Sequence, residues 1–204
     1  MLIAGLTGSI GMGKSAVARH MILRGVPVFD ADAEVHRLYA GPAVAAVEAA
    51  FPGATVDGRI ERPILARLLA ADPSGFARLE AIVHPMVHAA QRAFLHAAHS
   101  AGRPVAVLEI PLLLEKGPAD RVDRIIVVST TPENQRRRVL ERPGMTPERL
   151  EQILARQLPD TEKRRRAHYV VDTGTSLEET YAAVDRVLES LARLTGEAFD
   201  KHWR

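Results

Sequence analysis

One stretch near the start of the chain constrains its fold more than any other feature. Residues 8–15 read Gly-Ser-Ile-Gly-Met-Gly-Lys-Ser and fill every fixed position of the pattern G-x-x-x-x-G-K-[ST]. The apolar run Leu2–Leu6 precedes this stretch, and the helical stretch Ser15–Arg24 follows it. A strand that enters a glycine-rich loop and leaves as a helix is the context in which this pattern binds phosphate.

The residue types explain the chemistry of such a loop. Glycines let the backbone curl until consecutive N–H groups point at one anion, and the following helix adds its positive dipole end. Lys14 can reach the β- and γ-phosphates, and the Ser15 hydroxyl can ligate Mg²⁺. A glycine-rich turn without a ligand is the alternative, and the complete match argues against it. We therefore predict a nucleoside triphosphate site formed by Gly8, Gly11, Met12, Gly13, Lys14 and Ser15.

Composition limits the class of protein. The chain has 204 residues, is 47% hydrophobic and contains no cysteine, so disulfides and thiolate metal sites are excluded. No apolar stretch approaches the roughly 20 residues of a membrane-spanning helix. Met1 directly precedes the first apolar run, which leaves no room for a signal peptide. We expect a cytoplasmic protein.

Positive charge is concentrated in one segment. Residues 136–166 carry a net charge of +5, whereas the whole chain carries +2. Such a segment indicates a polyanionic ligand, either nucleic acid or the phosphates of small molecules. It contains no aromatic residue on which the bases of a single strand could stack, so we expect small-molecule phosphates and no nucleic acid.

Five short apolar runs predict buried parallel strands, because they are continuously apolar rather than alternating. They are Leu2–Leu6, Val26–Phe29, Val105–Ile110, Arg124–Val128 and Tyr169–Val171. Helical stretches lie between them, which predicts an α/β fold with a five-stranded parallel sheet covered on both faces.

Two long intervals interrupt this alternation. The interval between the second and third strands predicts an all-helical insertion that could hold a second substrate. Its helices are expected at Ala31–Tyr39, Ala43–Phe51, Arg62–Ala71 and Gly75–Ser100. The interval Pro132–Arg166 predicts a helix over Glu133–Arg142, a break at Pro143-Gly144 and a second helix that begins at Thr146. The last ten residues resemble a tail, docked through Trp203.

Two acids directly follow the second predicted strand. In open parallel sheets ligands bind beyond the carboxyl ends of the strands, so we expect Asp30 and Asp32 near the phosphates. One carboxylate there could accept the proton of an attacking hydroxyl group. Asp30 also occupies the position of a helix N-cap, and Asp32 could be a first-turn acid that faces the helix dipole. Position alone leaves both interpretations of Asp32 open.

The arginines of the basic segment differ in their expected roles. Arg138 and Arg142 are four residues apart and share one face of the predicted helix, where two guanidinium groups could clamp the γ-phosphoryl group. A solvated basic helix is the alternative. The later run Lys163–Arg166 is expected to lie mostly on the surface.

Further candidates lie after the third strand and in the insertion. Glu109 or Glu115 could contact Mg²⁺ through water, and Glu109 could alternatively pair with an arginine. His84-Pro85 could be a helix start or a substrate contact. The spacing of His84 and His88 is helical, but the Glu of H-E-x-x-H is missing, so we expect no metal site there.

Together these residues resemble the dephospho-coenzyme A kinase family over roughly Leu2 to Leu194. The matching segments occur in the family's order: Gly5–Ser15, Asp30-Ala31-Asp32, His84-Pro85, Pro111-Leu-Leu-Leu-Glu115, Gln135-x-x-Arg138-x-x-x-Arg142 and Glu151-Gln-Ile-x-x-x-Gln157. A phosphate-binding loop alone is unspecific, whereas the loop combined with D-A-D, H-P and P-L-L-x-E is a specific set.

The resemblance implies a P-loop NTPase core of the nucleoside-monophosphate-kinase type with three layers. It implies a nucleotide-binding core at residues 1–30, 101–131 and 167–204, a helical coenzyme A-binding insertion at 31–100 and a helical lid at 132–166. The implied reaction is the phosphorylation of the ribose 3′-hydroxyl of dephospho-CoA by ATP with Mg²⁺. By the same matching, Asp32, Lys14, Arg138 and Arg142 are catalytic, Asp32, His84, Pro111 and Leu112 bind substrate, and Ser15 with Glu109 (through water) is the metal site.

Three positions depart from the family pattern. Ala16, within the nucleotide contacts, stands where the family usually has Thr. His168 and Thr173 replace a common Asp and Asn, which affects the expected adenine contacts near the fifth strand. We expect none of these changes to touch the residues around the γ-phosphate.

Two other functions remain open from the residues. One is a kinase of the same fold that acts on a nucleoside monophosphate, although an Asp-Gly-Phe-Pro-Arg-like segment is missing. The other is a nucleotide-dependent switch, although the Asn-Lys-x-Asp guanine motif is missing. The sequence leaves a monomer and a small homo-oligomer equally open.

Overall fold

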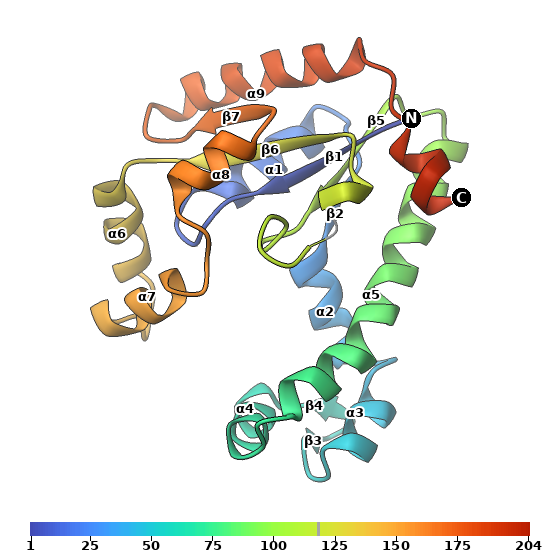
Figure 1. Ribbon diagram of the computed structural model, residues 1–204, viewed down its shortest axis with the longest axis vertical. Coiled ribbons are helices and arrows are strands. Elements are labelled where there is room, and N and C mark those ends of the chain that lie inside the picture. The colour runs from blue at the N-terminus through green and yellow to red at the C-terminus, as the bar shows by residue number, and fades with distance from the viewer. Residues whose placement is uncertain (118) are drawn as a thin grey trace. The chain divides into compact units, whose positions relative to one another are not determined.

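The computed structural model describes residues 1–117 and 119–204 (Figure 1). The chain divides into two compact units, and each is described by itself below. The first unit combines Met1–Phe29 with Leu95–Arg204, and the second is Asp30–Phe94. In the described part of the chain, no helix is both long and apolar enough to cross a membrane.

A parallel sheet forms the centre of the first unit. Within the described residues its strands follow the order β2-β5-β1-β6-β7, and β1 pairs in parallel with β5 and β6, as β6 does with β7. The strands are β1 (Leu2–Thr7), β2 (Val28–Asp30), β5 (Val105–Glu109), β6 (Arg124–Ser129) and β7 (Tyr169–Asp172). This confirms the predicted α/β class and the five-stranded sheet. The strand predicted at Val26–Phe29 begins two residues later because Pro27 has no N–H for the ladder.

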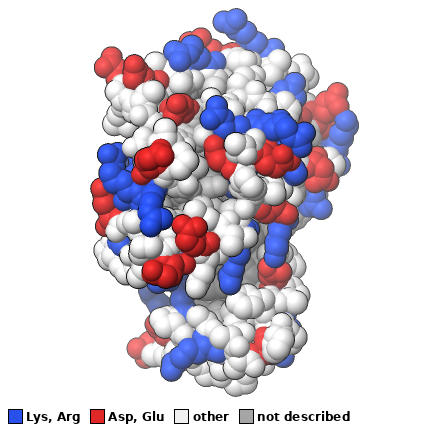
Figure 2. Space-filling view, turned by 60° about the vertical axis from the view of Figure 1, so that its left-hand side comes forward, with Lys and Arg blue, Asp and Glu red and all other residues white. Residues whose placement is uncertain are grey.

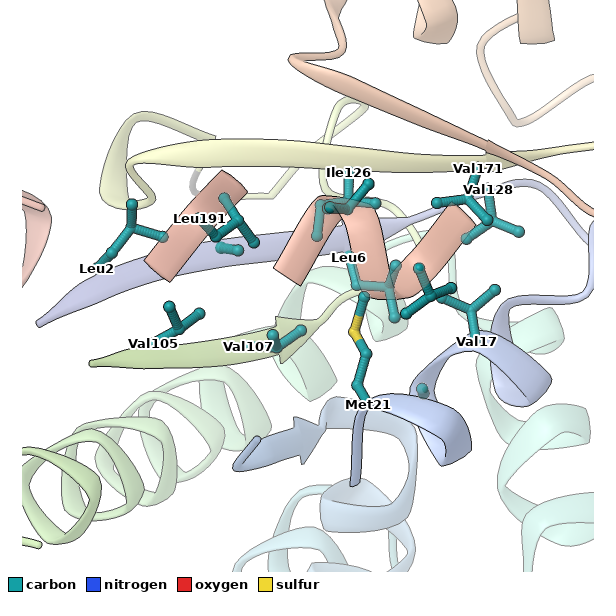
Figure 3. Packing of buried hydrophobic residues seen from close by; sticks show 14 of the residues in the cluster. Leu2, Leu6, Val17, Met21, Val105, Val107, Ile126, Val128, Val171 and Leu191 are labelled. Carbon is teal, nitrogen blue, oxygen red and sulfur yellow. The ribbon is translucent and has the colours of Figure 1, made fainter. Parts of the chain in front are cut away.

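The main core lies between the sheet and two helices that pack on each other, α1 (Lys14–Leu23) and α9 (Leu177–Ala192). Figure 3 shows Met21 of α1 pointing toward Leu6 of β1. Successive strand residues face opposite sides, so Gly5 faces away from this core. A Cβ atom at Gly5 would lie 2.5 Å from a Leu113 methyl group, so the loop after β5 covers the other face.

The basic segment folds into three short helices, α6 (Pro132–Leu140), α7 (Pro147–Leu154) and α8 (Asp160–Arg166). The Thr131 and Thr146 hydroxyls accept hydrogen bonds from Asn134 N and Arg149 N, which caps α6 and α7. The helix predicted to reach Arg142 ends at Leu140 instead. Pro143 disfavours helical geometry in the residue before it, which explains the earlier end.

The second unit was predicted to be all-helical, but it also contains two short strands. A hairpin of β3 (Thr55–Val56) and β4 (Arg59–Ile60) stands among α2 (Ala31–Tyr39), α3 (Val44–Ala50), α4 (Arg62–Ala71) and the first part of α5 (Gly75–Ser100). Asp57 and Gly58 both have positive φ, at 50° and 73°. Asp-Gly is the sequence that favours such two-residue hairpin turns, so this dipeptide is the sequence signal for the hairpin.

Helix α5 passes through His84-Pro85 without a break, so the alternative of a helix start at that position was wrong. Pro85 lies inside the helix, where it removes one backbone donor. His84 is exposed on the helix.

The C-terminal tail is docked as predicted. Its helical turn η2 (Phe199–Trp203) buries the Trp203 side chain completely, and the indole Nε1 donates to the Arg121 carbonyl at 2.9 Å. The Asp123 carboxylate accepts backbone hydrogen bonds from Ile3, Glu197 and Ala198 at 2.6–2.9 Å. Removing a buried Trp side chain costs about 3–5 kcal/mol, so this tail is part of the fold.

The contact between β6 and β7 predicts a pH-dependent stability. The Ile125 N–H donates to Nδ1 of His168 at 3.1 Å, which requires a neutral ring. Partial burial of the ring, and then the positive charge of Arg124, lower the pKa of His168. The unfolded chain, with a histidine pKa of about 6.5, therefore takes up the proton first, and stability is lost as the pH falls below that value.

We expect the free energy of unfolding in urea to decline between about pH 6.5 and pH 5 and the decline to be shallower in His168→Gln. The same replacement at the exposed His202 is the control and should leave the slope unchanged. Equal slopes in wild type and His168→Gln would contradict the assignment.

Candidate active site

The glycine-rich loop joins β1 to α1, and its shape depends on two glycines. Gly11 and Gly13 have φ values of 79° and 89°, which side chains other than glycine rarely adopt. A Cβ atom at Gly11 would lie 2.5 Å from a Val139 methyl group, so α6 packs directly on the loop. Both glycines are therefore required by conformation, and Gly11 also by close approach.

The N-terminus of α1 is open to an anion. Gly13 is its N-cap and supplies no side-chain acceptor, and no acid lies in the first turn. The first N–H groups of a helix have no acceptor within the helix, and the dipole adds partial positive charge there. This arrangement favours a phosphate group at Gly13, Lys14 and Ser15.

Lys14 contacts a carboxylate on the neighbouring strand. Its Nζ atom forms a short ion pair with Oε1 of Glu109, at the carboxyl end of β5. Glu109 is 5% exposed, so the pair is nearly buried. Of the two alternatives for Glu109, pairing with a cation is observed, but the cation is this lysine rather than an arginine. Removing either partner would leave a buried charge uncompensated.

The loop backbone is held from outside by two glutamines. The Gln157 side-chain oxygen accepts from Ile10 N at 3.2 Å, and the Gln135 amide donates to Ile10 O at 2.7 Å. The backbone N–H and the backbone carbonyl of Ile10 are thus both bound by side chains from residues 132–166. Both glutamines belong to the segments that resemble the family, but no role was expected for them. The spacing of Gln135 and Arg138 by one helical turn is the sequence feature that could have indicated a role for Gln135.

Arg138 is positioned by the residue after β7. Its two terminal nitrogens donate to Oγ1 of Thr173 at 2.9 Å and to the Thr173 carbonyl at 2.6 Å. The Thr173 hydroxyl in turn donates to the carbonyl of Met12 at 2.7 Å. We expected the change at Thr173 not to touch the residues around the γ-phosphate. That expectation was wrong, because Thr173 connects the phosphate-binding loop to Arg138.

Arg142 does not share a helix face with Arg138, since it lies beyond the end of α6. Its side chain is exposed and forms no ion pair with any residue that the structure describes. The two arginines therefore differ, because Arg138 is held by Thr173 and Arg142 is exposed to solvent.

Glu115 is held by an ion pair and a backbone hydrogen bond. Its Oε1 atom accepts from Leu158 N at 3.0 Å and pairs with Lys163 Nζ at 2.8 Å. The run Lys163–Arg166 lies mostly on the surface as expected, because Arg164, Arg165 and Arg166 are exposed, but the Lys163 side chain is fully buried. The acid of the P-L-L-L-E segment thus fastens α8 to the loop after β5.

The positive charge of the basic segment is partly neutralised by acids within it. Glu162 pairs with Arg165 and Arg166, whose hydrogen bonds lower the pKa of Glu162 to about 2. Glu151 pairs with Arg136 at 3.3 Å. On the face in Figure 2, Lys and Arg are interspersed with Asp and Glu. The net charge of +5 already counts these acids, and the pairs show which arginines they neutralise.

The remaining candidates are Asp30, Asp32, Pro111 and Leu112, each described by its own contacts. Asp30 caps α2, accepting from Ala33 N at 2.9 Å. Asp32 is in the first turn of that helix, exposed and without an ion-pair partner among residues 1–117 and 119–204. Pro111 and Leu112 follow β5, where the Thr7 hydroxyl donates to the Pro111 carbonyl at 3.0 Å and Leu112 is partly exposed. Across the described residues, no three His, Cys, Asp or Glu side chains form a metal-binding group.

Comparison with known proteins gives whole-chain similarities. A family model described as dephospho-CoA kinase matches residues 2–179. A dephospho-CoA kinase of Rhodopseudomonas palustris strain HaA2 is 53% identical over 194 residues, covering 95% of this chain and 98% of the relative. The dephospho-CoA kinase of Agrobacterium fabrum is also 53% identical, with the same coverage of both chains.

Solved structures share the fold of this chain. A crystal structure from Thermus thermophilus superposes with a TM-score of 0.79 at 38% identity, covering 96% of this chain and 98% of that one. A dephospho-CoA kinase from Campylobacter jejuni has a TM-score of 0.64 at 20% identity, with 93% and 96% covered. A shikimate kinase from Acinetobacter baumannii has a TM-score of 0.52 at 17% identity, with 96% of both chains covered. The last two likenesses concern the fold alone.

Proposed function

The chain belongs to the dephospho-CoA kinase family, and we propose how its residues transfer the γ-phosphoryl group of ATP to the ribose 3′-hydroxyl of dephospho-CoA. This transfer is the final step of coenzyme A biosynthesis. The observation that carries the residue assignment is the open N-terminus of α1 beside the Lys14–Glu109 pair.

The nucleotide phosphates bind at Gly8, Gly11, Met12, Gly13, Lys14, Ser15 and Ala16 in this proposal. Backbone N–H groups at the start of α1 bind the phosphate oxygens, and Lys14 adds a point charge at the β- and γ-phosphates. Glu109 keeps the ammonium group at the carboxyl edge of the sheet until phosphate competes for it. Ala16 offers no hydroxyl, so the α-phosphate relies on backbone donors.

Mg²⁺ would be held by the Ser15 hydroxyl and, through water, by Glu109. The fit rests on the donor set: Ser15 is exposed in the first turn of α1, and Lys14 contacts only one oxygen of Glu109. When bound, the ion neutralises charge on the transferring phosphoryl group. Mg²⁺ takes few protein ligands beside nucleotide phosphates, which suits a site without an acidic cluster.

Two arginines of the lid, residues 132–166, stabilise the transferring group. Arg138 supplies a guanidinium that is already oriented, and the exposed Arg142 moves in as the lid closes over the nucleotide. Donors fixed before reaction cost no reorganisation in the transition state. Exclusion of water by the lid favours transfer over hydrolysis.

The acceptor side of the reaction is assigned to the insertion, residues 31–100, and to the loop after β5. Asp32 accepts the proton of the ribose 3′-hydroxyl, and His84, Pro111 and Leu112 contact dephospho-CoA. The exposed, unpaired carboxylate of Asp32 supports its role as the base, since a salt-bridged acid would be a poorer proton acceptor.

The reaction is tested by incubating the purified protein with MgATP and dephospho-CoA and measuring coenzyme A by mass spectrometry. AMP, CMP, dTMP and pantetheine are offered in parallel. We expect coenzyme A and ADP in equal amounts, and no comparable transfer to the other acceptors. Transfer to a nucleoside monophosphate without formation of coenzyme A would overturn the proposal.

Lys14→Met should lower kcat by about 10²–10³-fold, the usual cost of losing one preorganised charge at the reacting group. It should also lower the melting temperature, because Glu109 is left as an unpaired buried charge. The double variant Lys14→Met/Glu109→Gln should regain stability but not activity. Lys201→Ala, at an exposed lysine, is the control. Recovery of kcat in the double variant would show that Lys14 acts only on stability.

Asp32→Asn keeps the shape of the side chain but removes the basic oxygen, so kcat should fall by about 10²–10⁴-fold while the affinity for ATP stays similar. Asp30→Asn is the matched control, since Asn caps a helix about as well as Asp. The measurement is steady-state kinetics with both substrates varied. A kcat within about threefold of wild type in Asp32→Asn would reject the base assignment.

A further inference from the structure

Thr173 is buried between the phosphate-binding loop and the lid. It follows β7 directly, is 6% exposed and bonds both Met12 and Arg138. A Cβ atom at Gly13 would lie 2.9 Å from Oγ1 of Thr173 and 3.2 Å from its Cβ and Cγ2 atoms. Thr173 therefore also packs against the peptide at which α1 begins.

Chemistry settles the direction of these hydrogen bonds. A guanidinium group can only donate and a backbone carbonyl can only accept. The single proton of the Thr173 hydroxyl is thus directed to the Met12 carbonyl, and its lone pairs receive the Arg138 N–H. The second Arg138 nitrogen is bound by the Thr173 carbonyl. Two acceptors on one residue fix both the position and the plane of the guanidinium.

We propose that Thr173 is a positioning residue whose hydroxyl sets the Arg138 guanidinium in fixed register with the phosphate-binding loop. The inference rests on the proposed role of Arg138 at the phosphates. A hydroxyl is required because the position needs a donor and an acceptor on one atom, which neither a methyl group nor a carboxylate supplies. Misplacement of a catalytic group by about 1 Å can cost about 10²-fold in rate.

The test is a double-mutant cycle in kcat. Thr173→Val keeps the shape of the side chain but removes the hydroxyl, and Thr173→Ser keeps the hydroxyl. We expect Thr173→Val to lower kcat at least tenfold in the wild-type background and less than threefold in an Arg138→Met background. Thr173→Ser should remain within threefold of wild type. The exposed Thr175→Val, the same change two residues away, should have no effect.

A second readout does not need the acceptor substrate. Calorimetric titrations with MgATP and MgADP give the preference of each variant for the γ-phosphate. Thr173→Val should reduce this preference only while Arg138 is present. If wild type makes no coenzyme A, the proposed function fails. The same set of variants measured by nucleotide binding still tests the coupling between Thr173 and Arg138.

Three results would overturn the inference. An equal loss from Thr173→Val with and without Arg138 would mean that the hydroxyl supports the loop alone. Equal losses in Thr173→Val and Thr173→Ser would mean that kcat depends on the exact packing of the whole side chain and not specifically on the hydroxyl. Thr173→Val could also lower the affinities for ATP and ADP equally, and by the same factor as kcat. That result would likewise mean that the hydroxyl supports the loop alone. If Thr173→Val does not fold, Thr173→Ala in the same two backgrounds answers the same question.

Discussion

The structure of this site depends on a backbone that must keep its N–H groups turned toward one point. Gly11 and Gly13 permit that curl, but glycine also makes a loop conformationally free. Side chains from elsewhere remove this freedom by binding other backbone groups of the loop. Gln157 accepts from the Ile10 N–H, Gln135 donates to the Ile10 carbonyl, and Thr173 donates to the Met12 carbonyl. The inward groups at the start of α1 then remain for phosphate without further ordering.

Features with a strong local cause were predicted well from sequence. The strands were found because continuous apolar runs suit a sheet buried on both faces, and the phosphate-binding loop because its glycines and lysine are fixed by local geometry. The docking of Trp203 follows from the cost of leaving so large an apolar surface in water. Capping by Asp30 and Thr146 follows from unpaired N–H groups at a helix start.

Features that depend on contacts distant in sequence were missed. The run Lys163–Arg166 was expected to lie mostly on the surface, as its arginines do, but the burial of Lys163 depends on Glu115, 48 positions earlier. The role of Thr173 depends on two partners, one of them 161 residues away. Arg142 was misplaced for a local reason, since the effect of Pro143 on the preceding residue was not weighed against helical spacing.

The buried pair of Glu115 and Lys163 makes one part of the lid segment, residues 132–166, harder to displace than the rest. Parting these charges inside the protein costs several kcal/mol per ion, whereas the neutral hydrogen bonds of Gln135 and Gln157 contribute about 0.5–1.5 kcal/mol each. Glu115 also binds the N–H of Leu158, so the anchored part begins at that peptide. Helix α8 is therefore fixed to the loop after β5, and Arg138 ties α6 to the residue after β7, so any swing of the proposed lid falls to α7 and the segments that flank it.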